Sequence, residues 1–120
     1  SSLLIDKEAL SPMVRGENEY LYQSVAGKSN PHEILEMITA INAEGRPIWK
    51  PMHMQPIYRM NAFVTAKGSG RAQSNAYIDE EETQDVGMDI FSRGLCLPSD
   101  NKMTAEEQDR IIEVIHRAFD

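Results

Sequence analysis

The most restrictive feature of this sequence is a proline-spaced stretch that also holds its only tryptophan, Arg46-Pro-Ile-Trp-Lys-Pro-Met-His-Met-Gln-Pro-Ile-Tyr58. Each proline fixes φ, removes a backbone donor and favours an extended conformation in the residue before it. This proline segment (residues 46–58) is therefore predicted to be a rigid extended ribbon, neither a helix interior nor a central strand. Ordered loops held by a scaffold often carry function, so its candidate binding residues are Arg46, Trp49, Lys50, His53, Gln55 and Tyr58. The alternative is a connector whose Trp49 and methionines fill the core.

Composition limits the class of protein and of partner. A chain of 120 residues suits one domain, 1–120, with a core of its own. The net charge of −7 argues against a nucleic-acid partner, because binding phosphate requires a basic surface. No apolar run approaches the length of a membrane span, so no membrane partner is expected. The single cysteine, Cys96, provides no disulfide framework and favours a reducing, cytoplasmic location.

A first helix is predicted over residues 31–43. Asn30 is a suitable N-cap, Pro31 occupies the first helical position, and Glu33 completes a capping box. An apolar stripe follows at helical spacing, formed by Ile34, Leu35, Ile38 and Ile41. Gly45 is predicted to stop the helix, which then leads directly into the proline segment.

The remaining pattern predicts two further helices and two short strands. Residues 3–6 and 95–97 are predicted strands, and 82–93 is a helix closed by Gly94. A second capping box, Thr104 to Glu107, opens a last helix whose expected apolar face comprises Ile111, Ile112, Val114, Ile115 and Phe119. This order indicates an α+β fold, a small antiparallel sheet with helices packed on one face. The proline segment or residues 63–65 could add an edge strand. Residues 7–30 and 67–71 are expected to be irregular or flexible, with residues 20–22 as a short helical or extended piece.

The chemistry-bearing side chains give few catalytic signals. His32, His53 and His116 lie on separate elements without metal-ligand spacing, so no metal site is predicted. His53 is the candidate for a ligand-binding or proton-transfer role, the alternative being a packed histidine. Lys50 and Arg46 are candidates for pairing a phosphate or carboxylate, the alternatives being an exposed lysine and a helix-capping arginine.

Two segments together resemble a known family. The proline segment resembles the "SRP-W-K-P-M-H-x-Q-P" segment of the nucleotide-sugar aminotransferases, the DegT/DnrJ/EryC1/StrS family of pyridoxal phosphate enzymes. The run Phe91-Ser-Arg-Gly-Leu-Cys-Leu-Pro-Ser99, followed by Thr104-Ala-Glu-Glu-Gln-Asp-Arg-Ile-Ile112, resembles the closing "RGLCLPS…T-E-E-Q-D-R-I-I" segment of that family. The two matches occur in the family's order and cover about half of the chain.

The resemblance implies that this chain is the small C-terminal domain of a fold type I enzyme. It implies pyridoxal phosphate bound mainly by the enzyme's own N-terminal cofactor domain, which also carries the Schiff-base lysine, so Lys50 is not that lysine. The implied reaction moves an amino group from glutamate to a UDP-4-keto-6-deoxy sugar, in a homodimer, for surface glycans. Arg46, Trp49, Lys50, His53 and Gln55 are then the implied substrate-binding candidates.

The chain departs from the family pattern at residues 7–30 and 59–82, which are longer than the resemblance leads us to expect. The alternative function is a stand-alone binding or interaction module that reuses this fold.

Overall fold

The computed structural model describes residues 1–15, 20–22, 25–58, 61–65, 68–71 and 85–120. The chain forms two compact units. The first combines Ser1–Ile48 with Arg93–Asp120, and the second is Trp49–Ser92. One boundary between the units therefore falls inside the proline segment, after Ile48. In the described residues, a small antiparallel sheet and α-helices give the α+β class predicted from the sequence.

The sheet of the first unit contains β1 (Ser2–Leu4), β7 (Gly94–Cys96) and β4 (Arg46–Pro47). The strand β7 is central and antiparallel to both neighbours, with Leu95 opposite Leu3 on one side and Pro47 on the other. The predicted strands at residues 3–6 and 95–97 are thus present with shifted bounds. The proline segment does supply an edge strand. An edge position suits Pro47 because proline has no N–H to donate to a second neighbour.

The helix α1 (Pro31–Ala40) begins at a buried polar cap. The Asn30 side-chain oxygen accepts a hydrogen bond from the backbone N–H of Glu33 at 2.9 Å, as predicted. The Glu33 carboxylate accepts a hydrogen bond from the Ser29 hydroxyl at 2.8 Å, so Ser29 takes the place of the predicted reciprocal bond. Asn30 is 2% exposed, and its amide donates to the Ser11 hydroxyl at 2.9 Å, which ties the start of α1 to the N-terminal segment.

The helix α1 ends at Ala40, three residues earlier than predicted, because Asn42 reverses the chain. Asn42 has a φ of 59°, and the backbone N–H of Ala43 donates to the carbonyl oxygen of Ile38 at 3.2 Å. This left-handed residue and its hydrogen bonds form the helix-terminating motif that we assigned to Gly45. Gly45 instead lies where packing is close, since a Cβ there would be 2.7 Å from Cδ2 of Leu35 and 3.2 Å from the carbonyl oxygen of Cys96.

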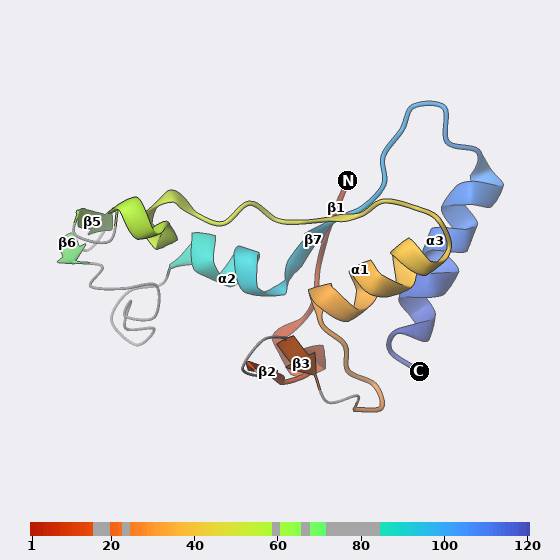
Figure 1. Cartoon of the computed structure of the whole chain (residues 1–120), viewed down its shortest axis with the longest axis horizontal. Helices are drawn as coiled ribbons and strands as arrows, with labels where there is room; N and C mark the ends of the chain where they lie inside the picture. Colours follow the sequence, from red (N-terminus) through yellow and green to blue (C-terminus); the bar gives the residue numbers. More distant parts are fainter. Residues whose placement is uncertain (16–19, 23–24, 59–60, 66–67, 72–84) are drawn as a thin grey trace. The chain divides into compact units, whose positions relative to one another are not determined.

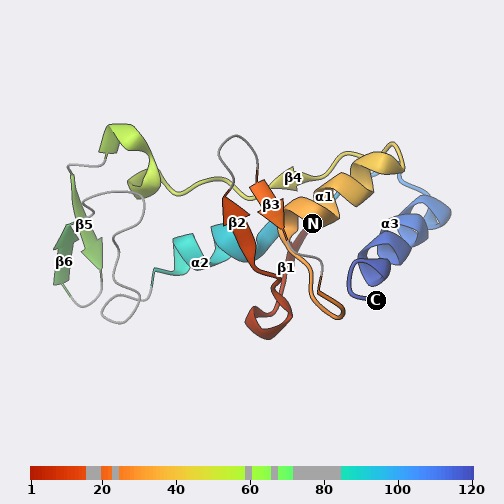
Figure 2. The same cartoon turned by 60° about the horizontal axis from the view of Figure 1, so that its bottom comes forward.

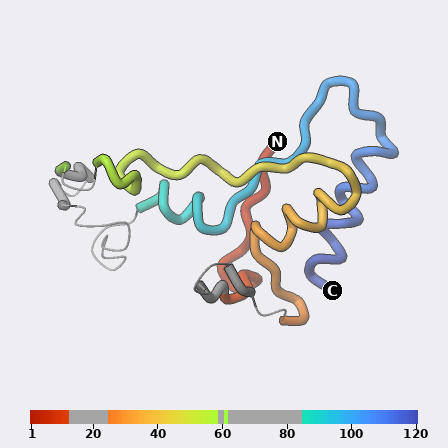
Figure 3. The backbone as a smooth tube through the Cα atoms, in the orientation of Figure 1, coloured from red at the N-terminus to blue at the C-terminus, as the bar shows by residue number. Residues whose placement is uncertain are grey.

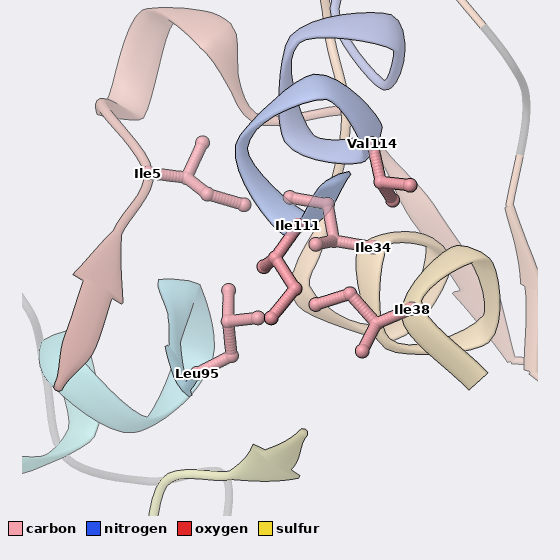
Figure 4. Packing of buried hydrophobic residues seen from close by; sticks show 6 residues of the cluster. All are labelled: Ile5, Ile34, Ile38, Leu95, Ile111 and Val114. Atoms are coloured by element: carbon pink, nitrogen blue, oxygen red, sulfur yellow. The ribbon is translucent and has the colours of Figure 1, made fainter. Parts of the chain in front are cut away.

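The core of the first unit lies between its sheet, α1 and α3 (Ala105–Arg117), as Figure 1 shows for the helices and Figure 4 for the side chains. The predicted capping box of α3 is confirmed, with Thr104 and Glu107 exchanging hydrogen bonds of 2.9 and 3.2 Å. Six buried apolar side chains converge on the core: Ile5, Ile34, Ile38, Leu95, Ile111 and Val114. Ile112, which was predicted to lie on the apolar face of this helix, is 43% exposed.

Two hairpins replace segments that the sequence pattern left irregular or flexible. The strands β2 (Met13–Arg15) and β3 (Tyr20–Tyr22) pair in antiparallel fashion within residues 7–30, as Figure 2 shows. A short 3₁₀ turn, η1 (Lys7–Ala9), precedes them. In the second unit, β5 (Ala62–Thr65) confirms the predicted strand at residues 63–65, but it pairs with β6 (Gly68–Arg71) and not with the three-stranded sheet.

The proline segment is extended only in its first part. After Pro51 it forms two 3₁₀ turns, η2 (Met52–Met54) and η3 (Pro56–Tyr58), and the tube in Figure 3 winds accordingly. The prediction of an extended ribbon was wrong here, because the fixed φ of proline also suits a 3₁₀ turn. Gln55, which precedes Pro56, keeps the predicted extended conformation at φ −75° and ψ 138°.

The helix α2 (Val86–Arg93) leads into β7 at Gly94, as predicted, and the predicted first residues of this helix, 82–84, lie outside the described residues. Of the helices that the structure describes, none combines the length and apolar character that crossing a membrane requires.

Candidate functional site

The candidate site lies in the second unit, where consecutive turns carry His53. Backbone hydrogen bonds close turns from Met54 to Pro51, from Gln55 to Met52, from Tyr58 to Gln55 and from Asn61 to Tyr58, all between 2.9 and 3.0 Å. The Gln55 side chain adds a hydrogen bond of 3.3 Å to the carbonyl oxygen of Lys50. Because these turns overlap or follow one another directly, local hydrogen bonds fix the backbone that carries His53.

His53 is paired with a carboxylate from a distant part of the sequence. The Nε2 atom of His53 lies 2.5 Å from Oδ2 of Asp85, and these side chains are only 17% and 3% exposed. The other carboxylate oxygen, Oδ1, accepts a hydrogen bond of 3.0 Å from the backbone N–H of Met88. Asp85 therefore acts as the N-cap of α2 and also holds the imidazole.

A hollow of about 200 Å³ adjoins this pair. Among the described residues, Met52, His53, Tyr58 and Asn61 line it and provide a thioether, an imidazole, a phenol and an amide. Such a mixture of one apolar surface and several hydrogen-bonding groups suits a polar ligand that carries hydroxyl groups. The hollow is thus the place in the described residues where the predicted site residue His53 meets space for a ligand.

The other predicted site residues are distributed between the two units. Arg46 belongs to the first unit, where its guanidinium pairs with the Glu44 carboxylate and both side chains are more than 70% exposed. Trp49, in the second unit, is 79% exposed, so the alternative in which it fills the core is wrong. Lys50 is half-buried, and Gln55 is used to brace the turn.

Metal chemistry has no support in the described residues, where no group of three or more histidine, cysteine, aspartate or glutamate side chains is placed to hold an ion. His32 and His116 are exposed. His32 lies 3.9 Å from the Glu36 carboxylate one helical turn away, which is a surface pairing.

Sequence reasoning missed Asp85, because it placed this residue inside a helix spanning 82–93. The available signal was an aspartate directly before the first apolar residue of the helix, which is a preferred N-cap. That signal predicts the hydrogen bond to Met88. The pairing with His53, which is 32 residues away, has no counterpart in the local pattern.

A larger hollow of about 340 Å³ lies in the first unit, between the end of α1 and the start of α3. Its charged groups already serve the helix ends, since Glu107 belongs to the α3 capping box and Arg110 donates to the carbonyl oxygen of Ile41 at 3.5 Å. The remaining charges, Glu44, Asp100 and Lys102, are exposed and of both signs. Size therefore does not identify the site, and the smaller hollow beside the buried His53–Asp85 pair is the better candidate.

Comparison with known proteins shows sequence similarity to a protein named as an aminotransferase. No protein-family model matches the sequence. The chain is 37% identical over 90 residues to EpsN of Bacillus subtilis (strain 168), which carries the provisional name of a pyridoxal phosphate-dependent aminotransferase. The match covers 75% of this chain but 20% of EpsN, so the chain spans about one fifth of the length of its relative. The likeness supports an aminotransferase domain.

Proposed function

We propose that this chain is the C-terminal small domain of a pyridoxal phosphate-dependent aminotransferase of the DegT/DnrJ/EryC1/StrS family. The proposed reaction transfers an amino group from glutamate to a UDP-4-keto-6-deoxy sugar, in a cytoplasmic homodimer. The observation that carries the proposal is the 37% identity to EpsN over three quarters of the chain. In this proposal the domain covers the substrate pocket of its own N-terminal cofactor domain and is inactive alone.

The described residues do not provide a lysine that could hold the cofactor. A Schiff-base lysine sits in an enclosed pocket, where desolvation favours its neutral amine. Lys7, Lys28 and Lys102 are exposed and Lys50 is half-buried, with its backbone carbonyl bonded to Gln55. These residues do not fit the cofactor, and we assign no step of the amino transfer to them. In this proposal the cofactor is held mainly by the rest of the full-length protein.

Substrate binding is the role that the described residues suit. Trp49 offers an exposed aromatic surface on which a uracil or sugar ring can stack. The imidazole of His53, held by Asp85 beside the hollow, can exchange a hydrogen bond with a sugar hydroxyl. Lys50, which lies in the same unit as His53, is the cation proposed to pair with the diphosphate. Because hydrogen-bonded turns already fix the backbone around His53, little ordering entropy is lost when a ligand binds.

A first test separates a fragment from a complete enzyme. Pyridoxal phosphate is added to the 120-residue chain, and the absorbance band of a protein-bound Schiff base is sought. We expect no stable band that depends on a lysine. The reading frame upstream provides the second part of the test. A glycine-rich phosphate cup and a lysine encoded there support the proposal, whereas a start codon directly before Ser1 favours the stand-alone binding module.

A second test measures turnover in the full-length protein that contains this chain. We expect Trp49→Ala and His53→Ala to lower kcat/KM for the UDP-sugar by about tenfold or more, equivalent to ~1.4 kcal/mol of transition-state stabilisation. Binding of pyridoxal phosphate should remain unchanged. Ile57→Ala is the matched control, because Ile57 lies in the same segment and is 80% exposed. Unchanged kinetics in both variants would contradict the proposal that the proline segment contributes to the substrate pocket.

A further inference from the structure

We propose that Asp85 is a positioning residue that sets the orientation and the tautomer of the His53 imidazole. The inference starts from the pairing of Oδ2 with Nε2 at 2.5 Å and from the near-complete burial of the carboxylate, which is 3% exposed. The consequence for substrate binding rests on the proposed function, but the positioning itself concerns only these two residues and α2.

The direction of the hydrogen bond follows from the second contact of the carboxylate. Oδ1 of Asp85 accepts from the backbone N–H of Met88 at 3.0 Å, so the helix start holds this group as an acceptor. The N-terminus of a helix also favours a negative charge on its cap. With an ionised carboxylate on one side, Nε2 of His53 must carry the hydrogen and donate it. The neutral ring therefore has its lone pair on Nδ1.

Capping also fixes the position of the carboxylate. An aspartate that bonds to the third residue of its helix has little freedom about its side-chain torsions, since moving Oδ2 would break the bond from Oδ1 to Met88. The backbone of His53 is held separately by the turns that begin at Pro51 and Met52. Each partner is thus held by hydrogen bonds other than the one between them, which is the condition for a preorganised imidazole.

This arrangement defines what His53 offers to a ligand. In the tautomer with hydrogen on Nε2, the neutral imidazole uses Nδ1 as an acceptor and cannot donate from it. A hydroxyl group matches that acceptor, and a sugar carries several. Asp85 thereby sets which ring nitrogen of a neutral His53 carries the hydrogen.

The experiment uses the tautomer as its readout. The 120-residue chain is labelled with ¹⁵N, and two-bond ¹H–¹⁵N correlations of the imidazoles are recorded across the titration of each ring. These spectra distinguish a ring protonated on Nε2 from one protonated on Nδ1. The exposed His32 and His116 are internal references. We expect neutral His53 in the unmodified chain to be protonated on Nε2.

Two variants change the partner while keeping a good helix cap. In Asp85→Asn, the side-chain oxygen can still cap α2, and the amide then faces Nε2 as a donor. We expect His53 to switch to the Nδ1-protonated tautomer. In Asp85→Ser, the hydroxyl caps the helix but is too short to reach the imidazole, so we expect a mixture of tautomers. His32 and His116 should be unaffected in both variants.

Each outcome bears on the proposal. An unmodified chain with neutral His53 protonated on Nδ1, or variants that leave its tautomer unchanged, would overturn the positioning role. Loss of the folded spectrum in both variants would assign Asp85 to stability alone and would equally overturn it. Because the tautomer is measured without a ligand, this test can succeed even if UDP-sugar turnover disproves the proposed function, and the reverse also holds.

Discussion

Each of the two units of this chain is stabilised by a different kind of interaction. In the first unit, six apolar side chains between the sheet, α1 and α3 are less than 10% exposed. In the described part of the second unit, Met54 is the buried hydrophobic residue, at 8% exposed, and the clearest long-range tie is the polar His53–Asp85 pair. Large apolar side chains lie exposed in this unit, above all Trp49 at 79% and Ile57 at 80%.

This difference separates a unit stabilised by an apolar core from a unit that carries most of the proposed binding residues. An apolar core contributes stability in proportion to the area that it removes from water. A buried carboxylate paired with a histidine fixes the orientation of the imidazole ring. Burying the carboxylate costs desolvation free energy. The first unit is thus organised to fold, and the second presents aromatic and polar groups beside a hollow.

The largest expected effect tests the apolar side of this comparison. Ile111→Ala should lower the free energy of unfolding by about 2–5 kcal/mol, because it opens a cavity in the core of the first unit. Ile111 is 7% exposed and its neighbour Ile112 is 43% exposed on the same helix. Ile112→Ala is therefore the matched control and should cost ~1 kcal/mol or less. Urea unfolding followed by circular dichroism measures both, and equal losses would contradict the assignment of the core.

A smaller effect compares one glycine from each unit. A Cβ on Gly45 would lie 2.7 Å from Cδ2 of Leu35 and 3.2 Å from the carbonyl oxygen of Cys96, so Gly45→Ala should cost about 1–3 kcal/mol. Gly87 in α2 has more room, with the nearest contact 3.3 Å away at Pro51. A gain of ~1 kcal/mol or less in helix propensity should offset that contact. Thermal unfolding that ranks the two variants in the opposite order would break the comparison.

The smallest effect concerns the exposed cap of α3, in contrast to the buried cap of α2. The backbone N–H of Glu106 and the Thr104 hydroxyl donate hydrogen bonds to the Glu106 carboxylate and hold its pKa below the usual 4.5. A lowered pKa in the folded state stabilises the protein above pH 4.5, and this contribution is lost as the pH falls through the folded-state pKa. We expect Glu106→Gln to reduce slightly the change in the free energy of unfolding with pH at acid pH. Glu8→Gln, at an exposed position, is the control for the loss of one charge.

Much of the fold was predictable because its signals are local. The caps at Asn30 and Thr104, the apolar spacing of α1 and the apolar strand before Pro98 each act within a few residues. An N-cap satisfies backbone donors two or three residues away, so a short sequence motif contains all of its partners. The sequence also indicated which segment carries the candidate site, for a similar reason. Each proline restricts its own backbone and that of the preceding residue.

Other features depended on contacts between distant residues. Only the tertiary structure showed that the proline segment divides at Ile48, so that Arg46 and His53 belong to different units. It also showed that Gly45 lies at a close approach to Leu35 and Cys96, while Asn42 reverses the chain. The pairing of His53 with Asp85 joins side chains 32 residues apart through burial and a shared helix cap. The sequence by itself determined where α1 and α3 begin and which loop is constrained, because those forces are local. Tertiary structure decided which carboxylate holds the histidine, because that depends on how separate segments pack.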